Sequence, residues 1–150
     1  MRVLVLNGPN LNMLGEREPE VYGSTTLADI ERQLAGVAAD LGVTVRFEQR
    51  NSEGELVDLI QESRSGDGLV LNPAAYGHYS YALRDAVAAA GIPCIEVHIS
   101  NVYARESFRH TSVIAPVTAG YICGCGVFGY QLALRAVVQR IREREARSSG

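Results

Sequence analysis

Strands and helices alternate along this chain, and several of the strands are short, wholly apolar runs. Val3–Leu6 and Gly68–Leu71 carry no charged residue, and each precedes a segment with helical periodicity. Such runs are typical of parallel strands that helices cover on both faces. Further strands are expected at Val43–Phe47, Ile92–Ile99 and Gly120–Cys123. We therefore predict an α/β fold with a five-stranded parallel sheet and helices on both faces.

The segments between these strands carry the signals of helix ends. Thr26 and Ser52 are expected to cap the N-termini of two helices, each with an acidic residue three positions later. Another helix is predicted over Tyr81–Ala90, and a terminal helix over Phe128–Glu145. Val102–Arg109 is expected to be a short helix or an ordered loop. Val43–Phe47 alternates apolar and polar residues, which is typical of a half-buried strand at or near a sheet edge.

Composition restricts the classes of function. A chain of 150 residues favours a single domain, residues 1–150. The net charge of −3 predicts no general attraction to nucleic acid or to anionic membranes. No apolar run approaches the roughly 20 residues of a membrane span, and Met1 leads directly into a strand without a secretory signal. The odd number of cysteines in apolar runs predicts reduced thiols, so a cytoplasmic location is expected.

The chain contains no lysine, because all 14 basic residues are arginine. Schiff-base chemistry through a lysine amine is therefore excluded. A Walker-type phosphate loop is excluded for the same reason. Arginine suits bidentate recognition of carboxylates and phosphates, so basic sites in this protein are expected to bind anions.

The connection after the first strand is unusually long. It runs from Asn7 to Gly23, whereas strand-to-helix connections are normally about 2–6 residues long. Its Asn-Gly-Pro-Asn start predicts a tight turn, attributed to the tolerance of Gly8 for positive φ. Gly15 and Gly23 bracket a polar segment, as hinges bracket a lid. Long connections in compact domains are usually functional or disordered, and we expect residues 15–23 to be mobile without a ligand.

Polar residues gather where three of the predicted strands end. They lie in residues 7–22, 72–78 and 96–101, and Arg105 and Arg109 follow shortly after. The carboxyl ends of parallel strands meet at one edge of the sheet, and ligands bind there at the switch point in strand order. An active site is therefore expected at this edge.

His98 and Glu96 are the first candidates for chemistry. They are two residues apart on a strand, so their side chains share a face. A carboxylate beside an imidazole holds its tautomer and prepares it as a general acid. A metal site of Glu96, His98 and His78 is the alternative, but the nearby arginines would repel a dication. We therefore predict no metal.

Arg17 and Tyr22 suggest the matching base. A guanidinium near a phenol favours the tyrosinate, which is basic enough to take a proton from the carbon next to a ketone. Arg105 and Arg109 are four residues apart, so on a helix they would share a face and could clamp an anion. Together with His98 as the acid, this set suits proton abstraction followed by elimination.

The sequence resembles type II 3-dehydroquinate dehydratase over nearly its whole length. The similar segments are Asn7–Gly15, Arg17–Pro19 and Val21–Gly23 near the start, and Glu96–Val102 with Ala104–Arg109 later. Asn72-Pro73, His78 and the Ala82–Ala86 stretch also match in order and spacing. Residues 124–134 are similar but less distinctive.

This resemblance implies a flavodoxin-like fold and a cofactor-free dehydration of 3-dehydroquinate to 3-dehydroshikimate, a step towards aromatic amino acids. It implies trans elimination through an enolate, with the roles divided between two groups of residues. The catalytic group would be Tyr22 as base, Arg17 as its activator, Asn10 as the residue that positions a water for the enolate, and His98 as acid, oriented by Glu96. The substrate-binding group would be Asn72, His78, Asp85, Ile99, Ser100, Arg105 and Arg109. Asp85 would come from a neighbouring subunit of a trimer-based homo-oligomer, commonly a dodecamer.

The sequence departs from the family pattern around His78. Gly or another small residue is usual where Ala74 and Ala75 stand, and Thr is usual at Gly77 and at position 79. Tyrosines at 79 and 81 add bulk, which is expected to alter the rim of the substrate site or a subunit contact. Gly77 is expected to loosen the presentation of His78.

Two other functions are compatible with such a fold. One is a module that binds a small anion without chemistry, which fold alone does not exclude. The other is a flavin protein, which is disfavoured because the chain has no Trp and no Ser/Thr-rich phosphate loop after the first strand.

Overall fold

The computed structural model describes residues 1–150 and contains one sheet of five parallel strands. The strands are β1 (Arg2–Asn7), β2 (Thr44–Gln49), β3 (Gly68–Asn72), β4 (Cys94–His98) and β5 (Gly120–Cys123). Their order in the sheet is β2-β1-β3-β4-β5. This is the flavodoxin-like order, so the predicted fold class is confirmed, and so is the edge position of the second strand.

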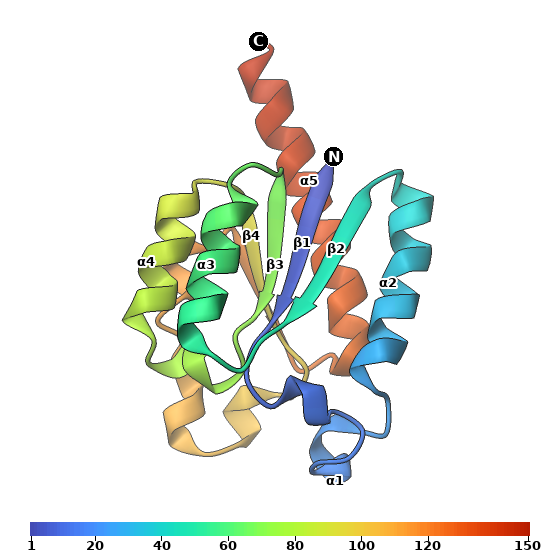
Figure 1. Cartoon of the computed structure of the whole chain (residues 1–150), viewed down its shortest axis with the longest axis vertical. Helices are drawn as coiled ribbons and strands as arrows, with labels where there is room; N and C mark the ends of the chain where they lie inside the picture. The colour runs from blue at the N-terminus through green and yellow to red at the C-terminus, as the bar shows by residue number, and fades with distance from the viewer.

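Helices cover both faces of the sheet (Figure 1). The longer ones are α2 (Leu27–Leu41), α3 (Glu53–Ser63), α4 (Tyr81–Ala90) and α5 (Gly129–Ser148). One core cluster packs α2 and α5 against the sheet, and the other packs α3 and α4 against the opposite face. Within β1, Val3 and Val5 belong to the first cluster, whereas Leu4 and Leu6 belong to the second. Burial on both faces explains why the strand is apolar throughout.

The helix ends were largely predictable. The Thr26 hydroxyl accepts the N–H of Asp29, and the Asp29 carboxylate accepts the N–H of Thr26, which completes a capping box. The Ser52 hydroxyl likewise accepts the N–H of Glu55. At the other end of α2, Gly42 adopts the left-handed conformation with φ of 69°.

The long connection after β1 contains short helices that the sequence did not predict. It contains a 3₁₀ helix, η1 (Leu11–Met13), and a one-turn helix, α1 (Pro19–Tyr22). The opening turn of this connection also forms in a different way from the one predicted. The residue with positive φ is Asn10, at 68°, and not Gly8. Gly8 is required by a close approach, since a Cβ there would lie 2.6 Å from the carbonyl oxygen of Pro73.

The connection between β4 and β5 is also built from single turns. It contains η3 (Val102–Ala104), η4 (Ser107–His110) and η5 (Ala115–Val117). The segment Val102–Arg109, expected to be a short helix or an ordered loop, contains two 3₁₀ helices with Arg105 between them in an extended conformation. Two further 3₁₀ helices are η2 (Ala74–His78), after β3, and η6 (Gly126–Phe128), before α5.

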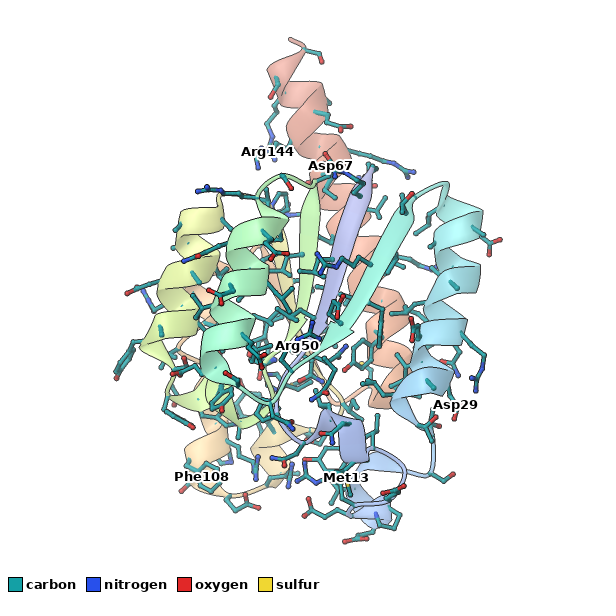
Figure 2. The ribbon with its side chains drawn as sticks, viewed as in Figure 1. Met13, Asp29, Arg50, Asp67, Phe108 and Arg144 are labelled. Carbon is teal, nitrogen blue, oxygen red and sulfur yellow. The ribbon has the colours of Figure 1, made fainter.

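Residues of η2, η3 and η4 line one cavity together with residues of η1 and α1, at the carboxyl ends of the strands. Figure 2 shows Met13 and Phe108 at this end, and Asp67 and Arg144 at the opposite one. The switch point in strand order lies between β1 and β3, whose last residues, Asn7 and Asn72, are register partners. The fold thus brings the ends of β1, β3 and β4 together, as expected for a ligand site.

Candidate active site

A cavity of about 150 Å³ opens at the carboxyl ends of the strands. Its lining includes all the predicted site residues except Glu96 and Asp85, namely Asn10, Arg17, Tyr22, Asn72, His78, His98, Ile99, Ser100, Arg105 and Arg109. Glu96 lies behind His98 and is fully buried. Asp85 lies on α4 and does not reach this cavity. The predicted side chains therefore come from separate segments to one small volume.

Two arginines surround Tyr22. The guanidinium of Arg105 donates a hydrogen bond of 2.6 Å to the Tyr22 hydroxyl. Arg17 lies over the ring, with its guanidinium carbon 5.0 Å from the ring centroid. The residue that contacts the hydroxyl is thus Arg105, whereas the sequence pointed to Arg17. The two guanidinium groups thus contact Tyr22 at its hydroxyl and at its ring face.

Glu18 holds these two arginines in place. Its carboxylate contacts Arg17 at 2.7 Å and Arg105 at 3.8 Å. Sequence reasoning missed this residue, because a glutamate in a polar loop carries no distinguishing pattern. Arg109 reaches the cavity from η4 and pairs with Glu106 outside it. Three arginines thus line the cavity, which suits an anionic ligand.

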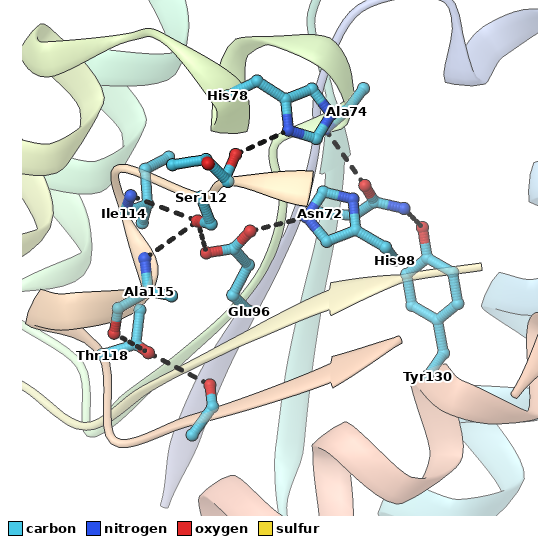
Figure 3. Close-up of polar contacts among 12 residues, drawn as sticks. Asn72, Ala74, His78, Glu96, His98, Ser112, Ile114, Ala115, Thr118 and Tyr130 are labelled. Carbon is cyan, nitrogen blue, oxygen red and sulfur yellow. Dashed lines mark hydrogen bonds and ion pairs between the residues drawn. The ribbon is translucent and has the colours of Figure 1, made fainter. Parts of the chain in front are cut away.

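The pair of His98 and Glu96 has the geometry that its spacing predicted. The Nε2 atom of His98 lies 2.6 Å from Oε2 of Glu96 (Figure 3). Because a carboxylate only accepts, Nε2 carries the proton of this bond. The other ring nitrogen, Nδ1, makes no hydrogen bond within the chain, and His98 lines the cavity. The pair can therefore present a proton from Nδ1 when the imidazole is charged.

The surroundings of His78 lower its pKa and so favour its neutral form. Its Nδ1 lies 3.0 Å from the carbonyl oxygen of Thr111, so Nδ1 carries the proton. Burial is the main cause that lowers the pKa of His78. Its ring stacks on that of His98 with centroids 5.9 Å apart. A neutral ring leaves Nε2 as a hydrogen-bond acceptor, which suits recognition of a hydroxyl group.

A buried tyrosine connects the ends of β1 and β3. The Tyr130 hydroxyl donates to Oδ1 of Asn7 at 2.6 Å and accepts from Nδ2 of Asn72 at 2.8 Å. Asn72 also accepts the N–H of Ala74 through Oδ1. Burial raises the pKa of Tyr130, so the hydroxyl keeps its proton. This network fixes the amide of Asn72 at the cavity, and sequence reasoning did not find Tyr130.

Replacing Tyr130 by Phe is expected to lower the free energy of unfolding by about 2 kcal/mol or more, because two buried amides each lose a partner. Urea unfolding of wild type and variant measures the difference. The matched control is Tyr81→Phe, since that side chain is 70% exposed, and its effect is expected to stay within about 0.5 kcal/mol. Equal stability of the two variants would contradict the role given to Tyr130.

Three residues other than glycine have positive φ, and all lie at this site. Asn10 has φ of 68°, Glu18 of 41° and Ala74 of 52°. Asn10 and Ala74 line the cavity, and Glu18 contacts two of its arginines. Residues held in this region of backbone space cluster at functional sites.

The departures around His78 differ in whether they reach the cavity. Ala74 and Ala75 line the cavity, whereas Tyr79 and Tyr81 do not and are largely exposed. Gly77 is buried, and a Cβ there would lie 2.8 Å from Cγ of Pro73 and 3.4 Å from Oε2 of Glu96. Packing therefore surrounds Gly77 closely, and we find no sign that it loosens His78.

No group of three or more His, Cys, Asp or Glu side chains is arranged to hold a metal ion. Glu96, a member of the alternative triad, already contacts His98 and Ser112. None of the helices combines the length and the apolar composition that a membrane span requires.

Comparisons with known proteins agree with this geometry. The model of the family described as "Dehydroquinase class II" matches residues 1–138. The chain belongs to the class II dehydroquinase family. The resemblance seen in the sequence is therefore confirmed.

Relatives and solved structures cover most of the chain. It is 62% identical over 137 residues to the 3-dehydroquinate dehydratase of Pelotomaculum thermopropionicum, covering 91% of this chain and 95% of that protein. It is 56% identical over 145 residues to that of Geotalea daltonii, covering 95% and 100%. The crystal structure of type II dehydroquinase from Butyrivibrio crossotus superposes with a TM-score of 0.90 at 46% identity, covering 91% of this chain and 97% of that one.

Proposed function

We propose that this protein is a type II 3-dehydroquinate dehydratase, a hydro-lyase that converts 3-dehydroquinate to 3-dehydroshikimate. The observation that carries the proposal is the cavity that Tyr22 and His98 both line, together with three arginines. Its family and the names of its relatives support the same reaction. The product leads towards aromatic amino acids through the shikimate pathway.

The reaction begins with proton transfer from carbon. Tyr22, as the phenolate, takes a proton from the carbon between the ketone and the carbon that bears the hydroxyl and the carboxylate. The electron pair of the broken C–H bond moves onto the ketone oxygen and forms an enolate. Arg105 donates a hydrogen bond to the Tyr22 oxygen, and Arg17 lies over the ring. Asn10 positions a water that hydrogen-bonds to the enolate oxygen.

Elimination then releases water. The enolate electrons return to form the new carbon–carbon double bond, and the C–O bond of the hydroxyl breaks. His98 gives its Nδ1 proton to the leaving oxygen, and Glu96 stabilises the imidazolium through Nε2. The proton that Tyr22 holds returns to solvent or to His98, which restores both groups. No redox step and no external reactant is required.

The other lining residues bind the substrate. Arg109 pairs with its carboxylate, and Asn72, His78, Ile99 and Ser100 contact its hydroxyl and carboxylate oxygens. Residues 15–23 act as a lid that closes over the bound substrate and excludes water. The glycines at its two ends have φ of 93° and 78°, which supports their role as hinges.

The assembly proposed is a trimer-based homo-oligomer, commonly a dodecamer in this family, in the cytoplasm. Asp85 would enter the cavity of a neighbouring subunit, which agrees with its absence from the lining of the cavity in its own chain. Three free cysteines, one of them exposed, support a reducing compartment. Mass measurement in solution tests the assembly.

Incubation of the purified protein with 3-dehydroquinate is expected to produce the ultraviolet absorbance of a conjugated enone carboxylate. Calorimetry with the same compound separates catalysis from binding alone. Heat of binding without product would favour the module that binds a small anion. Folded protein that yields neither signal would overturn the proposed function.

A further inference from the structure

Ser112 lies behind the pair of His98 and Glu96, in the connection between β4 and β5. Its hydroxyl donates to Oε1 of Glu96 at 2.7 Å (Figure 3). The same oxygen accepts the backbone N–H groups of Ile114 at 3.2 Å and Ala115 at 3.0 Å. Because two donors already occupy the acceptor positions of the oxygen, its only proton is directed at Glu96.

The two oxygens of Glu96 have separate partners. Oε1 accepts from Ser112, and Oε2 accepts from His98 at 2.6 Å. The residue is fully buried, so no solvent replaces a lost partner. The bond to Ser112 therefore fixes the plane of the carboxylate, and that plane fixes the direction in which Oε2 meets the imidazole.

The position of Ser112 does not depend on the cavity. The next residue, Val113, donates its N–H to the carbonyl oxygen of Gly77 at 2.9 Å and accepts a hydrogen bond from Arg84 on α4 at 3.0 Å. Ile114 is fully buried in the core beneath α3 and α4. Ser112 itself does not line the cavity. It is anchored by the fold and reaches the reacting groups only through Glu96.

We propose that Ser112 is a positioning residue for the general acid. Its hydroxyl accepts two backbone N–H groups and donates to Glu96, and Glu96 in turn accepts from His98. This series of hydrogen bonds keeps the neutral imidazole protonated at Nε2, so Nδ1 is the atom that gains and delivers the proton. The inference rests on the proposed function, because it deepens the role of His98 there.

Ser112→Ala is expected to lower kcat about 10- to 100-fold, because one hydrogen bond to a charged group is lost. KM is expected to change less than about twofold, since the hydroxyl does not touch the cavity. Ser112→Thr keeps the hydroxyl and is expected to restore most of kcat. Steady-state kinetics with 3-dehydroquinate measures both constants. An Ala variant with kcat within twofold of wild type would overturn the proposal.

The matched control is Thr118→Val, in the same connection. The Thr118 hydroxyl bonds to the carbonyl oxygens of Ala115 and Gly120 and not to Glu96. Removing the Thr118 hydroxyl weakens this connection without removing a contact to Glu96. The kcat of Thr118→Val is therefore expected to stay near the wild-type value. If Ser112→Ala does not fold, Ser112→Cys replaces it, because a thiol is a similar size and a weak donor. Equal losses in the Thr118 and Ser112 variants would count against positioning.

A second measurement does not need activity. Nitrogen-15 NMR of the His98 ring reports which nitrogen carries the proton. Wild type is expected to show the Nε2–H form, and Ser112→Ala a mixture of both forms. An unchanged tautomer in the variant overturns the inference about Ser112. Absence of turnover in wild type overturns the proposed function instead, so the two failures are distinguishable.

Discussion

Tyr22→Phe is expected to lower kcat for 3-dehydroquinate by about two to four orders of magnitude. The variant keeps the ring and its contact with Arg17, but it has no oxygen to take the proton from carbon. Substrate binding is expected to persist, because Arg109, which recognises the carboxylate, remains. Steady-state kinetics gives kcat, and calorimetry with the same compound gives the affinity of the variant.

Tyr103→Phe is the control for this substitution. Tyr103 lies in η3 near the cavity but does not line it, and it is 59% exposed. Its kcat is expected to match that of wild type. A Tyr22→Phe variant with near-normal kcat would remove Tyr22 as the base and leave Arg105 without the role proposed here.

His98→Gln is expected to reduce kcat by a similar two to four orders of magnitude. The glutamine amide can donate to Glu96 as Nε2 does now, so the buried carboxylate keeps a partner. The amide has no transferable proton at neutral pH, and the leaving hydroxyl departs unassisted. Steady-state kinetics with 3-dehydroquinate measures the loss.

His98→Ala separates chemistry from stability. This variant leaves Oε2 of Glu96 buried without its partner, which costs about 1–3 kcal/mol or more for a charged group. Thermal unfolding should therefore place His98→Ala below His98→Gln, while both have low kcat. If the glutamine variant were as active as wild type, His98 would not be the acid.

Much of the site could be predicted because it follows strand geometry. Two residues on one strand share a face whatever the fold around them, so the contact of Glu96 with His98 could be read from their spacing. Parallel strands with apolar runs end at one edge, so Asn72 and Asn10 were expected near each other. The family resemblance supplied the roles that geometry alone does not give.

The remaining contacts join residues that are distant in sequence. The hydroxyl of Tyr130 meets Asn7 across 123 positions, and Arg105 meets Tyr22 across 83. No local pattern distinguishes Tyr130 from the other apolar positions of its helix. The short helices at the site are equally hard to predict, because three to five residues are too few to show a period.

The left-handed residues at the cavity have a consequence for engineering. Each such conformation outside glycine costs about 1–3 kcal/mol, and Asn10, Glu18 and Ala74 place that cost beside the reacting groups. Substitutions that raise thermal stability at this edge of the sheet are therefore expected to lower turnover. A more heat-resistant enzyme is better sought elsewhere, as at Gly36 on α2, where a methyl group meets no atom within 4 Å and the helix gains from alanine.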